Sequence, residues 1–279
     1  MAADVTGNEL ATTTPASPAP APAPAPPQQP PAVWYPHRPR FLFVYGILGA
    51  VLAGAIALVV IYAGRAITPA PKWSTWHPHG GGLGAAKQIA DQVAKSYRLP
   101  NGDQLVDVIA KAPSVSPASS TSIPIHYVGV RGTKASGDKI ISVSSSNSVM
   151  YTLCGLGSGC SIATGKATVA RGTLVRREIL ELALYTFKYV GGVKSIVAFM
   201  PPPPGTQPQY VVYLQKSDVS AELKQPIAKT LAAKVPLPTA IPAREVHVID
   251  SVTEPRVYKF SLAQAQTGDA ILVLTPLPA

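Results

Sequence analysis

Hydrophobic positions divide the chain into zones. Residues 41–64 form an apolar run of 24 residues without a charged side chain, and amphipathic patterns begin only after residue 86. At about 1.5 Å per residue, a helix of this length exceeds the roughly 30 Å hydrocarbon core of a bilayer. The run is also longer than the apolar region of a cleaved signal peptide, which has about 7–15 residues. The pattern therefore predicts one transmembrane helix over residues 41–64.

Small residues recur along this predicted helix. Gly46, Ala50 and Gly54 lie four positions apart, and small residues at this spacing let two helix backbones approach closely. These three residues are therefore helix-packing candidates for a homodimer. The alternative is chance, because alanine-rich apolar segments contain such spacings without a packing role.

Residues 65–86 contain several prolines and a run of glycines, which predicts a juxtamembrane linker. Trp73 and Trp76 suit the membrane–water interface. His77 and His79 could supply half of a metal site, but the segment holds no Cys, Asp or Glu to complete it. We expect a plain linker and no metal.

Residues 87–279 have the pattern of a globular domain. Helical periodicity predicts helices over 86–99 and 174–190, and a third helix over 217–231 that is kinked at Pro226. Runs rich in Val, Ile, Tyr and Phe predict strands. The expected strands are 104–110, 123–130, 139–144, 149–154, 195–200, 210–215, 257–262 and 270–274, while 246–252 fits either a strand or a helix. This order predicts one mainly antiparallel α+β domain.

The segment 174–190 is the strongest predicted helix, and its wide apolar arc indicates a helix lying across a sheet. The charged residues that it carries are expected on its solvent-exposed rim. They are Arg176, Arg177, Glu178, Glu181 and Lys188. A run of four prolines at 201–204 then follows a predicted strand, and it is too stiff for a tight hairpin turn. We expect a projecting loop there.

The sequence holds two cysteines, Cys154 and Cys160, and three of the five residues between them are glycines. Glycine allows a tight turn, so a disulfide is favoured, and closing this ring contributes about 2 kcal/mol. The alternatives are a metal site, which needs more ligands than lie nearby, and two free thiols. A disulfide indicates an oxidising, extracytoplasmic location.

Composition adds a further region at the amino end. Eleven of the 30 prolines fall within residues 1–40, where they fix φ and remove backbone donors. The pattern predicts a disordered Pro/Ala-rich tail over 1–40 that acts as a spacer, with a docking strip for a partner groove as the alternative.

Charged residues make up only 14% of the chain, against about 25% in typical domains. The net charge is +10, of which +9 falls after residue 65, with 21 Lys and Arg against 12 Asp and Glu. Such a basic domain is attracted to anionic lipid head groups or wall polymers. It lacks the clustered basic and aromatic residues that nucleic-acid binding requires.

The flanking charges leave the orientation open. Arg38 and Arg40 precede the apolar run, and Arg65 and Lys72 follow it, so the positive-inside count is a tie. The predicted disulfide favours a cytoplasmic amino terminus and an extracytoplasmic carboxyl-terminal domain.

Four segments carry a resemblance. They read RLPNGDQLVDVIA (98–110), VMYTLCGLGSGCSI (149–162), ARGTLVRREILELALYTFKYVGGVKSIVAFMPP (170–202) and DAILVLTPLP (269–278). Together they resemble uncharacterised single-pass membrane proteins of actinobacteria with a proline-rich amino tail and an extracytoplasmic domain. The resemblance spans roughly residues 87–279 and implies location in a bacterial plasma membrane, without site residues.

Candidate catalytic groups are few. His126 and His247 lie in apolar, strand-like runs that indicate structural roles. Residues 136–139 match Ser-x-x-Lys but lack the companion motifs of penicillin-binding proteins. Glu245 and Asp250 are the nearest acidic pair and are expected at the surface. We therefore nominate no catalytic residue and expect no cofactor or metal.

These observations favour a membrane-anchored, non-catalytic accessory or binding/scaffold protein of the bacterial cell envelope. Its expected partners are the lipid bilayer, another envelope protein and a second copy of the chain, and no nucleic acid. The alternative is an extracytoplasmic cell-wall-processing hydrolase.

Overall fold

A computed structural model describes residues 38–64, 72–115, 122–132 and 137–278 of the chain. It divides into two compact units, residues 1–68 and residues 69–279. The predicted amino-terminal tail lies outside the described residues, apart from the start of the first helix.

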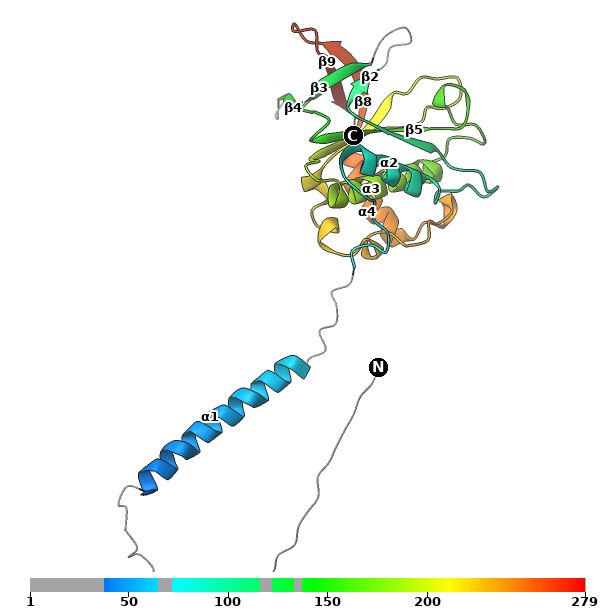
Figure 1. Cartoon of the computed structure of the whole chain (residues 1–279). Helices are drawn as coiled ribbons and strands as arrows, with labels where there is room; N and C mark the ends of the chain where they lie inside the picture. The colour runs from blue at the N-terminus through cyan, green and yellow to red at the C-terminus, as the bar shows by residue number, and fades with distance from the viewer. Residues whose placement is uncertain (1–37, 65–71, 116–121, 133–136, 279) are drawn as a thin grey trace, which may run out of the picture. The chain divides into compact units, whose positions relative to one another are not determined.

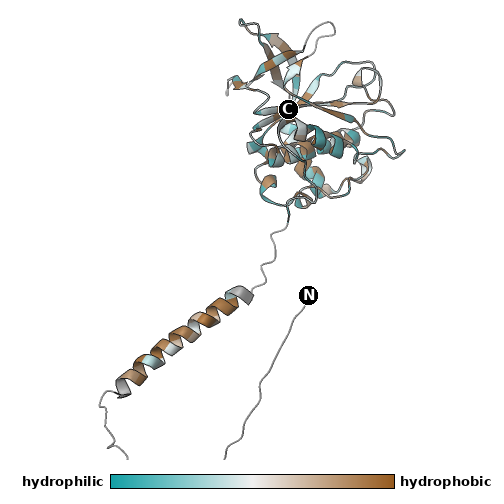
Figure 2. Ribbon diagram, viewed as in Figure 1, coloured by the Kyte–Doolittle hydropathy of each residue, from teal (hydrophilic) through white to brown (hydrophobic). Residues whose placement is uncertain are grey.

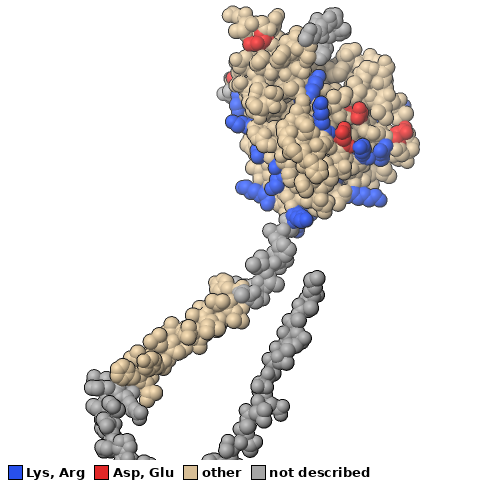
Figure 3. All heavy atoms as spheres, viewed as in Figure 1, with Lys and Arg blue, Asp and Glu red and all other residues tan. Residues whose placement is uncertain are grey.

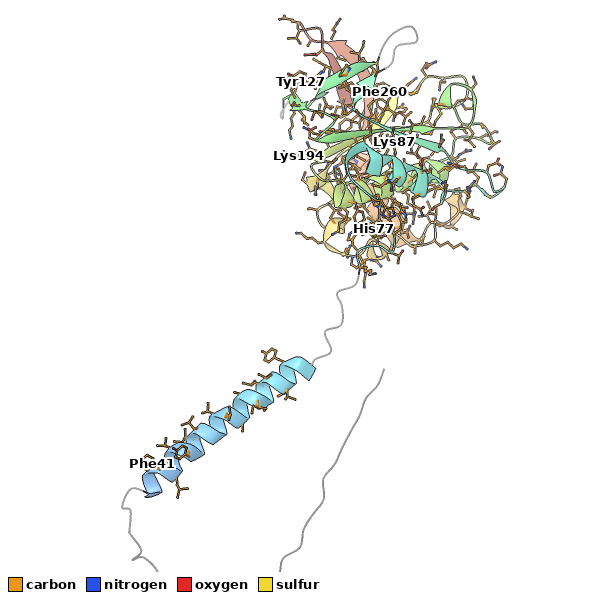
Figure 4. All side chains as sticks on the ribbon, viewed as in Figure 1. Phe41, His77, Lys87, Tyr127, Lys194 and Phe260 are labelled. Atoms are coloured by element: carbon orange, nitrogen blue, oxygen red, sulfur yellow. A yellow bond between two sulfur atoms is a disulfide. The ribbon has the colours of Figure 1, made fainter. Side chains whose placement is uncertain are left out.

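The first unit contains α1 (Arg38–Gly64). Its segment Phe41–Tyr62 is hydrophobic along its length and has no buried side chain. Figure 2 shows this helix coloured mostly as hydrophobic, and Figure 4 shows the Phe41 side chain projecting from it. By length and composition, α1 is able to cross a membrane, which agrees with the expected span.

The second unit is built on a nine-stranded sheet. Its strands are β1 (Asp107–Lys111), β2 (Ser114–Val115), β3 (Ile123–Val130), β4 (Lys139–Ser142), β5 (Ser148–Cys154), β6 (Ser195–Phe199), β7 (Tyr210–Gln215), β8 (Val257–Gln264) and β9 (Ala270–Pro276). The strand order is β1-β5-β6-β7-β8-β9-β3-β2, and β4 also pairs with β3. Only the β5–β6 and β3–β9 pairs are parallel, so the expected α+β class with mainly antiparallel pairing is confirmed.

Three helices cover one face of β1, β5, β6 and β7 (Figure 1). They are α2 (Gly82–Ala94), α3 (Val169–Tyr189) and α4 (Ala243–Thr253). Side chains alternate along each strand, so that Tyr151, Ile196 and Val212 point to the helices. Met150 and Val197 point to the other face.

That other face packs on the second half of the sheet. Met150 and Val197 share a separate core with Val128 of β3 and Leu272 of β9. Figure 4 shows Tyr127 of β3 and Phe260 of β8 in this half, at the end of the domain away from His77. The sheet therefore supports two cores, with the helices on one side and its own β8-β9-β3 half on the other.

Residues 217–231 do not form the expected kinked helix. They contain three short 3₁₀ turns, Lys216–Val219, Glu222–Lys224 and Ile227–Lys229. Pro226 cannot donate to a helical ladder, and Asp218 accepts the Gln215 N–H at 2.8 Å, which fixes the chain in a tight turn. The ambiguous segment 246–252 belongs to α4.

The expected linker over 65–86 is shorter in the structure. Helix α2 begins at Gly82, and Trp73 and Trp76 pack against the helical core instead of standing free for a membrane interface. The Trp73 ring meets the Tyr185 ring edge-on at 5.4 Å, and Ser74 Oγ lies 2.7 Å from Tyr185 Oη. Residues from Lys72 onward are therefore part of the domain.

Candidate functional site

An apolar groove lies where three segments meet at the start of α3. One wall comes from the residues after the disulfide loop, one from the first turns of α3, and one from the loop between β6 and β7. The lining residues include Ile162, Val175, Met200, Pro203 and Tyr210. The cavity has a volume of about 200 Å³.

The residues after the disulfide loop form the first wall, and the loop itself holds them in place. Cys154, at the end of β5, is joined to Cys160 by the predicted disulfide. The Gly155 N–H donates to the Cys160 carbonyl at 2.8 Å, and the Gly157 N–H donates to the Ser161 carbonyl at 2.9 Å. A Cβ on Gly155 would lie 2.1 Å from the Ser161 carbonyl oxygen. Glycine is therefore required at position 155 for the two sides of this loop to approach so closely.

The proline run forms the second wall. The Ile162 N–H donates to the Pro202 carbonyl at 3.1 Å, and Pro202 is buried. The expected projecting loop is thus tied at its first half to the disulfide loop, while residues 203–207 are exposed. Proline fixes φ at each position of the run, so this wall is stiff.

The first turn of α3 forms the third wall. Thr168 Oγ1 accepts the Arg171 N–H at 3.2 Å, as an N-cap residue does. The Arg171 guanidinium donates to the Thr164 carbonyl, and its partial burial lowers its pKa. Arg171 is the one charged side chain among the residues that line the groove.

The groove is an apolar binding surface and has few groups that could take part in a reaction. The described residues that line it include no carboxylate, thiol or imidazole. Small-molecule pockets have volumes of about 300–1,000 Å³, so this cavity is sized for one or two apolar side chains of a larger partner. The sequence singled out both loops, but the contact between Ile162 and Pro202 spans 40 residues and has no local signature.

A buried ionic cluster lies elsewhere on α3. Arg177 is 0% exposed and donates from Nε to Glu245 Oε2 at 2.8 Å, from Nη1 to Tyr97 Oη at 2.6 Å, and from Nη2 to the Ala232 carbonyl at 2.8 Å. Its Nη1 also lies 3.2 Å from Glu181 Oε2. The expectation that Arg177 lies on an exposed rim is therefore wrong.

Glu245 was expected at the surface, and this is also wrong, because it is 5% exposed. Helix α4 packs on α3, and the Arg177 guanidinium supplies the charge that lets the Glu245 carboxylate remain buried. Asp250 keeps its expected place near the surface, where Arg176 Nη2 lies 2.7 Å from Asp250 Oδ1.

Glu178 was expected on the exposed rim of α3, and the structure instead buries it. It is 0% exposed, and neither carboxylate oxygen has a hydrogen-bond partner. Burial raises its pKa well above the ordinary value, and the Glu181 carboxylate adds to the shift. Burial therefore favours the neutral form of the Glu178 carboxyl over the charged one.

The remaining candidate residues do not converge. His77 and His79 lie side by side, with ring centroids 5.8 Å apart. His126 is half exposed, 3.9 Å from Asp269, and His247 lies on α4 rather than on a strand. Within the described ranges, no three His, Cys, Asp or Glu side chains gather as metal ligands. Ser136 lies outside the described residues.

The helix-packing candidates Gly46, Ala50 and Gly54 all lie on α1. A Cβ built on Gly46 or Gly54 meets no atom within 4 Å, so a larger side chain is sterically possible at either position in the single chain. Their packing against a second helix stays a prediction.

The charge on the face shown in Figure 3 is not concentrated in one patch. Lys and Arg residues are spread over the domain on this face, and Asp and Glu residues are fewer.

Comparison of the chain with protein-family models, with curated proteins and with solved structures finds no match.

Proposed function

We propose that the chain is a membrane-anchored, non-catalytic binding protein of the bacterial cell envelope. In this proposal α1 spans the plasma membrane, the amino terminus is cytoplasmic, and the second unit is an extracytoplasmic accessory module. The apolar groove at the start of α3 holds a segment of another envelope protein. The groove carries the proposal, because the proline run that lines it is stiff, and the neighbouring disulfide loop restrains the chain just before Ile162, before any partner binds.

The groove also indicates the chemistry of its partner. Its lining is apolar except for the single cation Arg171, and the chain after residue 65 has a net charge of +9. An apolar side chain next to an acidic one would fill the cavity and pair with Arg171. We therefore expect an exposed partner segment that carries one or two apolar anchors and an acidic neighbour.

The location rests on two supporting observations. Helix α1 is long and apolar enough to span a bilayer, and the disulfide Cys154–Cys160 is typical of an oxidising compartment. A basic domain on that side is attracted to anionic lipid head groups and wall polymers, which keeps it near its partners. Gly46, Ala50 and Gly54 additionally favour a homodimer through α1.

Photo-crosslinking in native membranes tests the groove. A photoreactive amino acid at Ala167, an exposed residue that lines the groove, is expected to capture a discrete envelope protein in the full-length chain. The same amino acid at Ile140, which is 73% exposed on β4, serves as the control and is not expected to capture that protein.

A groove-filling variant sharpens the test. Gly172 lines the groove, and a Cβ there meets no atom within 4 Å, so Gly172→Leu has room at its first carbon and places its apolar end in the cavity. It is expected to lower capture at position 167 by about tenfold, as loss of one well-packed anchor does. Gly84→Leu, on the open side of α2, is the matched control. Equal capture by both variants, or hydrolysis of cell-wall material by the purified chain, would overturn the proposal.

A further inference from the structure

Strand β1 forms one edge of the sheet and is available to pair with another strand. β1 (Asp107–Lys111) pairs only with β5 and ends the strand order. Its outer side therefore leaves backbone N–H and C=O groups without a strand partner among the described residues. Edge strands of this kind pair readily with another extended chain.

The sequence of this edge is self-complementary. In an antiparallel pair of two β1 strands centred on Ile109, Asp107 of one copy lies opposite Lys111 of the other, twice over. The two Ile109 residues then face each other across the twofold axis. This pairing fits a single register. A slip by two residues would separate Asp107 from Lys111 and would leave each Ile109 without the other opposite it.

The side chains that would meet lie on one face. Asp107, Ile109 and Lys111 point away from the helices, whereas Val108 and Ala110 are buried beneath them. Ile109 is 48% exposed, although it lies in a strand whose other apolar residues are covered. Lys111 borders an open cavity of about 450 Å³ together with Phe260 and Leu262. Apolar surface is therefore accessible on the same face of the sheet as Ile109.

We infer that β1 is a homodimerisation edge, on which two copies of the chain join their sheets through an antiparallel β1–β1 pair. Charge complementarity between Asp107 and Lys111 selects a second copy over an unrelated peptide. This edge shares no residue with α1 or with the groove, whose lining ends at Val106, directly before β1. The interface is small, but two copies held in one membrane meet at high effective concentration.

Disulfide trapping of the full-length chain in membranes tests the register. In the proposed pair, the Ile109 Cα atoms lie about 4.5–5.5 Å apart, which is within disulfide range. We expect Ile109→Cys to form a dimer under mild oxidation at least about tenfold faster than Ile140→Cys, an exposed control on β4 that reports random collision. Equal rates for the two variants would overturn the inference.

Exchanging the charges of Asp107 and Lys111 tests whether disulfide trapping at position 109 comes from pairing of two β1 strands. In the Ile109→Cys background, Lys111→Glu places two like-charged pairs at the interface and is expected to slow trapping at least about fivefold. Adding Asp107→Lys restores both pairs with reversed signs and is expected to recover the original rate. A Lys111→Glu variant that only misfolds would not be rescued, and pairing with a different protein would not be rescued either. Near-ultraviolet circular dichroism checks that each variant folds, so failure of rescue in folded variants rejects the homodimer, while capture at Ala167 reports on the groove.

Discussion

At the scale of single residues, α3 carries its most consequential charges on the inside. Arg177 joins three segments, because its partners Tyr97, Ala232 and Glu245 come from the turn after α2, from the loop before α4 and from α4 itself. The neighbouring Arg176 is less buried: it forms an ion pair with Asp250 and donates to the hydroxyls of Thr173 and Thr253. Two adjacent arginines thus have unequal structural roles.

Arg177→Met is expected to lower the free energy of unfolding by about 3–5 kcal/mol, because it leaves the Glu245 carboxylate buried without a counter-charge. Arg176→Met is the comparison variant and is expected to cost less, about 1–2 kcal/mol, because the side chains of Arg176 and Asp250 are 15% and 36% exposed. Urea unfolding of the full chain in detergent, followed by near-ultraviolet circular dichroism, measures both. Similar losses for the two variants would show that the cluster does not organise the helical layer.

Glu178 gives a pH-dependent prediction. Its folded pKa is raised, so the folded state keeps a proton that the unfolded state releases above about pH 4.3. The native state then binds more protons, and stability falls as pH rises from that value toward the folded pKa. Glu178→Met removes this dependence and is expected to raise the free energy of unfolding at pH 7 by about 2 kcal/mol.

The gain from Glu178→Met is expected to shrink toward pH 4, where the wild-type carboxyl is mostly protonated in the unfolded state as well as in the folded one. Thermal unfolding at pH 4 and pH 7 measures this difference. Glu254→Met replaces an exposed glutamate and is expected to change stability little at either pH. A gain that is the same at both pH values would contradict a neutral, buried Glu178.

At the scale of elements, the disulfide loop depends on a covalent bond and on close backbone contacts. Replacing both Cys154 and Cys160 with Ser is expected to lower stability by about 2 kcal/mol, the value for so short a loop. With reductant present, wild type and variant are expected to unfold at the same denaturant concentration. A difference that persists in reductant would mean that the serine hydroxyls themselves disturb the loop.

Helix α1 has its own prediction. Gly54→Ile adds bulk where close helix approach would require a small side chain, so it is expected to reduce crosslinked dimer in membranes severalfold when crosslinking is made through α1. Val59→Ile, on an already bulky apolar position, is the control. An unchanged yield with Gly54→Ile would remove α1 from the dimer interface.

The elements were largely predictable because their patterns are local. The strand over 123–130 has the expected bounds, and α3 begins only five residues earlier than predicted. The turns over 216–229 were not predictable, since the cap from Asp218 to Gln215 competes with helix formation. The burial of Arg177 and Glu178 was also missed, because it depends on α2 and α4 packing against α3 from distant parts of the sequence.

The candidate site was predictable only in parts. The sequence identified the cysteine loop and the proline run, and the disulfide is confirmed. Their meeting through Ile162 and Pro202 arises from the sheet, because the parallel pairing of β5 with β6 brings the ends of both strands to one edge. Tertiary packing of this kind leaves no periodic signal in the sequence.

At the scale of the whole molecule, topology is the property to establish. After mild reduction, a membrane-impermeant maleimide is expected to label Cys154 and Cys160 in intact cells from which the outer layers have been removed. A Cys154→Ser, Cys160→Ser chain controls for labelling of other proteins. Labelling that appears only after lysis would place the domain in the cytoplasm and reverse the proposed orientation.

The packing of Trp73 and Trp76 has an optical consequence. Both indoles belong to an aromatic cluster with Tyr185 and Tyr189 on α3, and only one other tryptophan, Trp34, occurs in the chain. The intrinsic fluorescence of the domain therefore originates where the chain that follows α1 joins the fold. This fluorescence reports whether the segment that carries Trp73 and Trp76 is packed on α3, and no added label is needed.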